Sequence, residues 1–144
     1  MKKSDFIKQL DHPALEAAIA RAEAVTSGEI RVLVLKESVA EPVAAAQAAF
    51  TRLGMEKTRE RNGVLIFVAP ASQRFAVIGD EGVHAKRGQV FWDEMAAAMS
   101  GEFKRGQFTA GLLAGIERTG ALLAAHFPHR PNDRNELPNR IVSE

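Results

Sequence analysis

The sequence predicts an α/β fold, a three-layer sandwich in which a small mixed central sheet is flanked by helices. Two segments, residues 29–36 and 64–68, carry apolar side chains at both odd and even positions, which is typical of strands covered on both faces. Around them, apolar residues recur at helical spacing. A short turn after the second strand predicts a third strand, antiparallel to the second.

The predicted elements follow one another as helix, strand, helix, two strands and two helices. Asp11 and Pro13 mark the first helix start, because proline suits the first helical turn. The first two strands are joined through a helix, so we expect them to run parallel with a right-handed crossover. The expected segments are helices over residues 11–25, 41–53, 88–100 and 107–127, and strands over residues 29–36, 64–68 and 74–78.

One domain accounts for most of the chain of 144 residues. That length suffices for a single core that buries roughly two thirds of the unfolded-chain surface. We expect residues 1–127 to form this domain. From Pro128 onward the sequence is rich in proline, asparagine, aspartate and arginine, so residues 128–144 are expected to be an extended or disordered tail without helix or strand.

The composition excludes several functional classes. The chain has 19 Lys and Arg against 18 Asp and Glu, which gives a net charge of +1. It therefore lacks the basic excess that is typical of a nucleic-acid-binding protein. The sequence contains no cysteine, which excludes disulfides, thiolate metal sites and a cysteine nucleophile. It also lacks a Gly-x-Ser-x-Gly elbow, a Walker loop and a His-Glu-x-x-His motif.

No segment predicts secretion or a membrane span. Asp5 and Lys8 interrupt any apolar run that follows the first lysines. The apolar stretch over residues 108–127 contains Glu117 and Arg118 at its centre. Each of these charges would cost about 2.5–3.5 kcal/mol at the middle of a bilayer. We therefore predict a cytoplasmic protein without a transmembrane segment.

Several short motifs occur in a fixed order along the chain. They are Ser27-Gly28-Glu29-Ile30-Arg31-Val32, Asn62-Gly63-Val64-Leu65-Ile66-Phe67-Val68-Ala69-Pro70, the loop Gly79–Gly82, Gly88-Gln89-Val90-Phe91-Trp92-Asp93, Phe103-Lys104-Arg105-Gly106-Gln107-Phe108 and Asn135-Glu136-Leu137-Pro138. Together this series resembles the TPM domain, a family named for a thylakoid lumen protein, a photosystem II repair factor and a nematode receptor modulator. It is similar to the short, stand-alone bacterial branch of that family, over residues 24–138.

The resemblance implies an α/β sandwich and two candidate functions. Some plant members of the family are phosphatases, some members bind calcium or other metals, and many bacterial members occur in membrane-associated proteins. The first hypothesis is therefore a non-enzymatic binding or accessory module that acts with membrane-associated protein partners. The alternative hypothesis is a weak metal-dependent acid-phosphatase-like hydrolase.

Asp80, Glu81 and His84 form the candidate ligand site, at the end of the third predicted strand. Two carboxylates supply hard oxygen ligands for Ca²⁺ or another divalent metal, and flanking glycines allow a tight wrap around an ion. We assign Asp80 and Glu81 as metal ligands and His84 as a ligand-binding residue. The alternative is a polar turn in which Asp80 acts as a cap and Glu81 lies in water.

Glu29 and Arg31 form a second candidate, at the start of the first strand. They are two positions apart, so their side chains point to the same side of the sheet. One interpretation is a ligand-binding cleft for an anion. The other is a solvated ion-pair rim formed with charged residues that precede the second strand, namely Arg59, Glu60 or Arg61.

The only tryptophan, Trp92, lies on the helix predicted over residues 88–100. Phe91, Met95 and Met99 form one apolar stripe of that helix, so we expect Phe91 in the core. Trp92 is then expected to pack at the edge of the domain, with a contact to a partner as the alternative.

Overall fold

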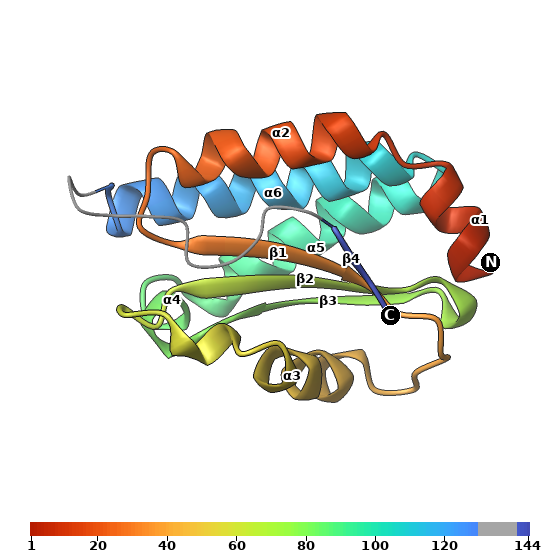
Figure 1. The fold of residues 1–144 in the computed structure, drawn as a ribbon, viewed down its shortest axis with the longest axis horizontal. Coiled ribbons are helices and arrows are strands. Elements are labelled where there is room, and N and C mark those ends of the chain that lie inside the picture. Colours follow the sequence, from red (N-terminus) through yellow and green to blue (C-terminus); the bar gives the residue numbers. More distant parts are fainter. Residues whose placement is uncertain (130–140) are drawn as a thin grey trace.

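A computed structural model describes residues 1–129 and 141–144 of the chain. Its centre is a four-stranded sheet with the strand order β3-β2-β1-β4 (Figure 1). The strands are β1 (Glu29–Val34), β2 (Gly63–Ala69), β3 (Arg74–Gly79) and β4 (Val142–Ser143). β2 runs parallel to β1 and antiparallel to β3, as predicted.

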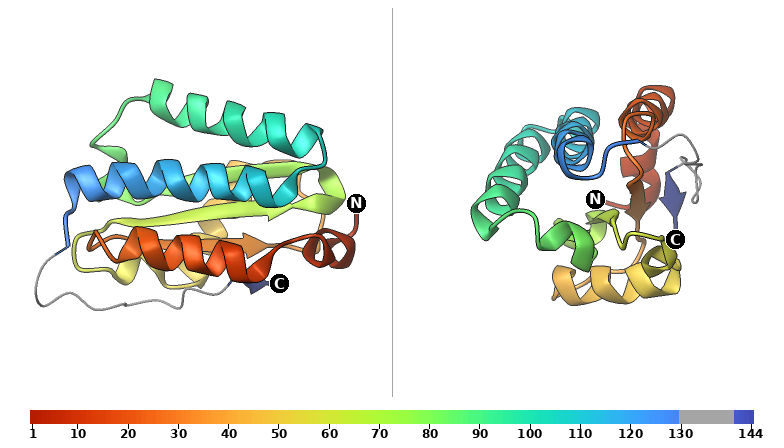
Figure 2. Two further views of the ribbon diagram at one scale, coloured as in Figure 1. Left: turned by 90° about the horizontal axis from the view of Figure 1, so that it is seen from above. Right: turned by 90° about the vertical axis from the view of Figure 1, so that its left-hand side faces the viewer.

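Helices cover both faces of the sheet and make three layers (Figure 2). One helical layer consists of α2 (His12–Glu23), α5 (Gln89–Lys104) and α6 (Phe108–His126). The other layer is α3 (Pro42–Arg52), followed by the 3-10 turn η1 (Met55–Lys57). The predicted class, an α/β sandwich with a mixed sheet between helices, is confirmed.

Two short helices lie at opposite ends of the sheet in Figure 1. The helix α1 (Lys3–Lys8) lies near the turn between β2 and β3, where the 3-10 segment η2 (Pro70–Ser72) joins the two strands. The helix α4 (Glu81–His84) lies at the other end, directly after β3. The sequence patterns predicted neither helix, because each is too short to show a helical repeat.

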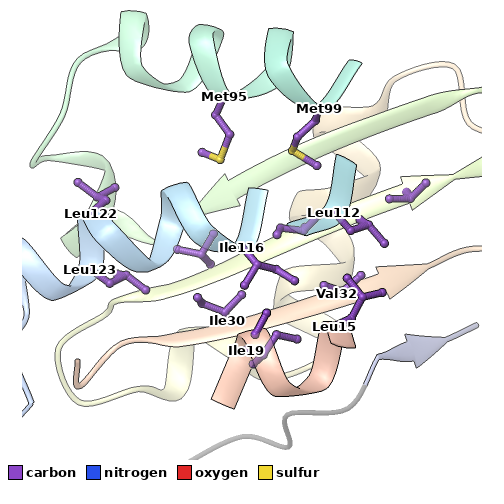
Figure 3. Close-up of a cluster of buried hydrophobic side chains, with 14 of the residues drawn as sticks. Leu15, Ile19, Ile30, Val32, Met95, Met99, Leu112, Ile116, Leu122 and Leu123 are labelled. Carbon is purple, nitrogen blue, oxygen red and sulfur yellow. The ribbon is translucent and has the colours of Figure 1, made fainter. Parts of the chain in front are cut away.

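Strand β2 is buried along its whole length, because its side chains alternate between two hydrophobic clusters. Val64, Ile66 and Val68 point into the larger cluster, which Figure 3 shows between the sheet and the layer of α2, α5 and α6. Leu65 and Phe67 point into the smaller cluster under α3. Because both faces of the strand are buried, every residue of this segment is apolar in the sequence.

The first helix of the core begins as the sequence predicts. The carboxylate of Asp11 accepts a hydrogen bond from the Ala14 amide at 3.1 Å, which satisfies one of the free donors at the start of α2. Pro13 follows in the first turn, where a missing amide proton costs nothing.

The expected place of Trp92 at the domain edge is wrong, and Phe91 packs against the core without being fully buried. Trp92 is buried with Met95 and Met99 in the larger cluster, while Phe91 is only partly buried. Residues 92 and 99 are seven positions apart, almost two full turns, so they share the inward face of α5. Phe91 packs edge-to-face against the Trp92 ring, with 5.3 Å between ring centroids.

The end of the chain also differs from the expectation. Residues 130–140 of the predicted tail lie outside the described residues. Val142–Ser143 form β4, which pairs in parallel with Leu33 and Val34 of β1. The prediction of a tail without any strand is therefore wrong at its end. No helix in the described ranges is long and apolar enough to cross a membrane.

Candidate functional site

The loop after β3 places Asp80 against Arg61, on the segment that leads into β2. Arg61 Nε donates to Asp80 Oδ2 at 2.8 Å, and Arg61 Nη2 donates to Asp80 Oδ1 at 2.9 Å. The Asp80 side chain is only 6% exposed, whereas that of Arg61 is 42% exposed. The hydrogen bond to Asp80 raises the pKa of the Arg61 guanidinium above its ordinary value. This is a fork-to-fork ion pair between a buried acid and a half-exposed base.

Backbone contacts hold Asp80 in this position. Its amide donates to the Gly63 carbonyl at 2.9 Å, which extends the pairing of β3 with β2 by one bond. Its carboxylate also accepts from the Glu81 amide at 2.8 Å and so caps α4. Asp80 therefore begins a helix, where a tight loop over residues 79–82 was expected. The predicted capping role of Asp80, part of the polar-turn alternative, is what the geometry shows.

Gly82 lets the two loops meet. Its amide donates to the Arg61 carbonyl at 2.9 Å. A Cβ atom at this position would lie 2.5 Å from the Glu60 carbonyl oxygen and 2.6 Å from that of Arg61. Real Cβ atoms do not approach backbone oxygens so closely, so only glycine fits at this contact.

Glu81 lies on the outer side of the same pair. Its carboxylate is 3.3 Å from Arg61 Nη1, and its side chain is 73% exposed. Arg61 thus bridges the two acids that we assigned as metal ligands. Their mutual repulsion is relieved by a guanidinium, in the place where a divalent cation would do the same.

The present arrangement does not fit a divalent metal ion. A calcium site needs six to eight oxygen ligands. Both oxygens of Asp80 are already used by Arg61 and by the Glu81 amide. Across residues 1–129 and 141–144, no three His, Asp or Glu side chains gather as metal ligands would.

The other predicted ligand residues are His84, on α4 beside this pair, and Glu29 and Arg31, on β1. The His84 ring stacks on Trp92 at 6.0 Å between centroids, so it faces α5. Glu29 and Arg31 are buried in β1, so a solvated rim is not what they form. The ion pairs of Arg61 go to Asp80 and Glu81 and not to β1.

A partly buried acidic group lies beside the start of β1. Glu23, the last residue of α2, accepts a hydrogen bond from the Ile30 amide at 2.8 Å through Oε2. Burial raises the pKa of the Glu23 carboxyl to about 9, and the nearby Glu29 carboxylate adds to the rise. Arg31 acts in the opposite direction, and so does the Ile30 hydrogen bond. Burial therefore favours the protonated form of the Glu23 carboxyl.

Arg61 is the site residue whose role the sequence patterns did not predict. It lies in the run of residues 56–61 with alternating charge, which reads as a solvated helix end. The one feature of the sequence that could have indicated this role is the position of Arg61 directly before Asn62 and Gly63, where the chain turns into β2. Arg61 has a φ of 53°, a left-handed conformation that is uncommon outside glycine. That backbone turn aims its side chain at Asp80.

Two of the motifs behind the family resemblance meet at this end of the sheet. The Asn62 amide group donates to Ser27 Oγ at 3.1 Å, and the Ser27 hydroxyl donates to the Glu60 carboxylate. The Glu29 amide donates to the Asn62 carbonyl at 3.4 Å. Segments 33 to 35 positions apart in sequence are thus joined where β1 and β2 begin.

The mixed sheet between two helical layers, with a polar cluster where β1 and β2 begin, defines a small α/β sandwich domain. The parallel strands place Asp80 at their amino ends, whereas open α/β sheets bind most ligands at the carboxyl ends. The chain belongs to the TPM domain family, whose sequence model matches residues 1–122.

Solved structures agree with this assignment. The BA42 protein from the psychrophilic bacterium Bizionia argentinensis, solved by NMR, has 41% sequence identity to this chain. The two structures align over 92% of either chain with a TM-score of 0.84. The N-terminal domain of a P. gingivalis protein is 18% identical, with a TM-score of 0.63 over 79% of this chain and 76% of that one. The N-terminal domain of the cg2496 protein from Corynebacterium glutamicum is 19% identical, with a TM-score of 0.57 over 74% of this chain and 67% of that one.

The last two likenesses show the shared fold alone. No protein with a curated description matches the sequence of this chain.

Proposed function

We propose that this TPM domain is a non-enzymatic binding or accessory module that acts with a membrane-associated protein partner. The observation that carries the proposal is the Arg61–Asp80 ion pair, which commits the best-placed acid of the candidate site to a structural role. A metal-dependent hydrolase needs such an acid to hold an ion or a proton near a substrate. Here the acid holds two loops and a helix cap together.

The surface that we assign to the partner is formed by residues 84–90, from the end of α4 to the first turn of α5. Residues 84–90 are all exposed, and Val90 is 68% exposed, the highest value among the large hydrophobic residues that the structure describes. Lys86 and Arg87 precede Val90 in the chain. The Lys86 ammonium lies 5.8 Å from the Phe127 ring centroid, and the Arg87 guanidinium lies 4.7 Å from that of Phe91. An exposed apolar side chain that follows two cationic residues in the chain suits a protein surface that offers an apolar pocket with acidic neighbours.

In-cell photo-crosslinking tests the partner surface. A benzophenone side chain at position 90 should give one discrete adduct that fractionates with membranes. Position 43 is the matched control, because Val43 is 53% exposed but lies on α3 in the opposite layer. The same adducts from both positions, or none from position 90, would contradict the proposed surface.

The hydrolase alternative is tested by a chelator. We expect no turnover of p-nitrophenyl phosphate that depends on both a divalent ion and Asp80. The comparison uses the parent, Asp80→Ala and the control Arg118→Gln, which changes an exposed residue of α6. Turnover that EDTA removes, and that Asp80→Ala lacks, would establish the hydrolase and overturn the binding module as the sole function.

A calcium site at Asp80 and Glu81 remains part of the proposal in one form, in which the ion displaces Arg61. The two cations compete for the same oxygens, so millimolar Ca²⁺ should raise the melting temperature of Arg61→Gln more than that of the parent. Equal shifts in the two proteins would place the ion elsewhere in the chain. The cytoplasmic location stays a prediction from the sequence.

A further inference from the structure

A cavity of about 390 Å³ lies at the end of the sheet opposite to Asp80. It opens to the surface and is lined by residues of α1, the turn between β2 and β3, the last turn of α5 and the first turn of α6. Its volume falls within the range of about 300–1,000 Å³ that is usual for small-molecule sites. The catalytic and partner hypotheses described above use none of its lining residues.

Four phenylalanines form the wall of this cavity. Phe6 contacts Phe108 with 4.9 Å between ring centroids, and Phe75 meets Phe103 edge-to-face at 5.2 Å. Phe6 also meets Phe103 edge-to-face at 6.4 Å, so the rings form one connected set. Phe75, Phe103 and Phe108 stay partly exposed although they touch the larger core cluster. Ring faces and edges are therefore available to an aromatic guest.

The cavity also has a positively charged rim. Arg74, at the start of β3, and Lys104, at the end of α5, both line it and are both exposed. No acidic side chain is among the described residues that line it. The acid closest in sequence to Lys104, Glu102, is already paired with Arg105. Two cations beside an aromatic wall favour a ligand with one negative end and one aromatic end.

We propose that this cavity, the Phe6–Phe103–Phe108 pocket, is a binding site for a small aromatic carboxylate. The ring of the ligand packs edge-to-face against the phenylalanines, and its carboxylate lies between Arg74 and Lys104. Ser100 and Gln73, which also line the cavity, supply neutral hydrogen-bonding groups near the same rim. The inference is independent of the proposed partner surface, which lies near α4.

The class of ligand follows from the match of size and charge. A neutral aromatic compound gains binding energy from the phenylalanine wall but not from the charged rim. An inorganic anion gains binding energy from the rim but not from the wall. An aliphatic acid fills the volume without the edge-to-face contacts that rings make with rings. A ligand with both features is therefore selected over each of the three.

Titration with 2-naphthoate, followed by ¹H–¹⁵N NMR of the full chain, tests the proposal. We expect saturable shifts for amides around the pocket, such as those of Phe75, Ser100 and Phe103, with a dissociation constant of about 1 mM or tighter. The neutral isostere 2-naphthamide should bind about fivefold more weakly, because it lacks the charge that the rim recognises. Inorganic phosphate should give no shifts at the phenylalanine wall.

Three variants separate the rim from the wall. The double variant Arg74→Gln with Lys104→Gln should weaken 2-naphthoate binding to the level of 2-naphthamide and leave 2-naphthamide binding unchanged. The control Arg118→Gln should bind both compounds like the parent. Ser100→Phe places a ring in the cavity and should abolish the binding of both 2-naphthoate and 2-naphthamide.

Three outcomes of the titrations overturn the proposal. These are the absence of saturable shifts up to 10 mM probe in the parent, equal affinity for the acid and the amide, and shifts that map away from the pocket. Concentration-dependent dimerisation that the probe reverses would likewise replace the small carboxylate by a second copy of the chain as occupant.

Discussion

Arg61 and Asp80 are joined by two parallel hydrogen bonds of 2.8 and 2.9 Å, and each residue is unusual in a way that the other explains. Asp80 is an acid with a side chain only 6% exposed, which is tolerable because the guanidinium neutralises it. Arg61 is a non-glycine residue with a φ of 53°, a conformation that the ion pair helps to hold. The pair therefore fixes the relative position of the two loops at this end of the sheet.

The first prediction separates the ion pair from the backbone at position 61. Both Arg61→Ala and Arg61→Gly remove the partner of the buried Asp80 carboxylate, but only glycine adopts a positive φ without strain. We expect Arg61→Ala to melt below the parent, and Arg61→Gly to melt about 3 °C above Arg61→Ala. Differential scanning calorimetry at low salt measures both. If alanine matched or exceeded glycine, the left-handed conformation at this position would be wrong.

The second prediction concerns the contact of Gly82 with the Arg61 loop. Because a Cβ atom at position 82 would lie 2.5 Å from the Glu60 carbonyl oxygen, Gly82→Ala should lower the free energy of unfolding by about 1–3 kcal/mol. The matched control is Gly101→Ala within α5, where the only atom near the new Cβ is Arg105 Nη1 at 3.9 Å. That change should stabilise the protein by about 0.5–1 kcal/mol through helix propensity. Urea denaturation of both variants measures whether each change lowers or raises the free energy of unfolding.

These two contacts also show where prediction from sequence ends. Strand β2 could be predicted because every residue from Val64 to Val68 must be apolar to fill a cluster on each face of the sheet. The helical positions of Leu15 and Ile19 follow from the same kind of burial. A local hydrophobic period is enough for such elements.

No hydrophobic period in the sequence indicates the Arg61–Asp80 pair. The two residues are 19 positions apart on separate loops, and their meeting depends on a positive φ at Arg61 and on the missing side chain of Gly82. Asp80 and Glu81 were identified as a site because they are adjacent acids after a strand. Their cationic partner was not, because an arginine in a run of mixed charge looks like any solvated one. The strand β4 was missed for a related reason, since two residues carry no alternation.

The third prediction is a pH dependence of stability that arises from Glu23. Its pKa rises from the ordinary 4.5 in the unfolded chain to about 9 in the folded one. Between these values the folded chain holds a proton that the unfolded chain has lost, so this contribution to stability is complete below about pH 4.5 and is lost as the pH rises toward 9. Glu23→Gln keeps an oxygen for the Ile30 amide and has no proton to lose.

Relative to the parent, Glu23→Gln should therefore become more stable as the pH rises from 5 to 9, by at most about 1.4 kcal/mol per pH unit. Guanidinium titrations at pH 5, 7 and 8.5 measure the difference. Glu16→Gln, at an exposed position of the same helix, should show no such trend. A difference that stays constant with pH would mean that the Glu23 carboxyl is ionised in the folded protein.

The last prediction concerns the C-terminal strand, in the part of the chain for which the sequence predicted an extended or disordered tail. The structure instead joins Glu144 to the end of β1 and to Lys36, two residues after that strand. The Glu144 amide donates to the Val34 carbonyl at 2.9 Å, and the Lys36 amide donates to the Glu144 carbonyl at 2.7 Å. Ile141 also packs against the larger hydrophobic cluster, and Val142 against the smaller one.

Deletion of residues 141–144 should accordingly lower the free energy of unfolding by about 2 kcal/mol, since each lost backbone hydrogen bond contributes about 0.5–1.5 kcal/mol and apolar surface is uncovered. The control Glu144→Gln removes only the exposed ion pair with Arg52 and should cost less than about 0.5 kcal/mol. Thermal and urea unfolding of both variants tests the difference. If the deletion melted like the parent, β4 would contribute no net stability, and the edge of β1 would tolerate exposure to water.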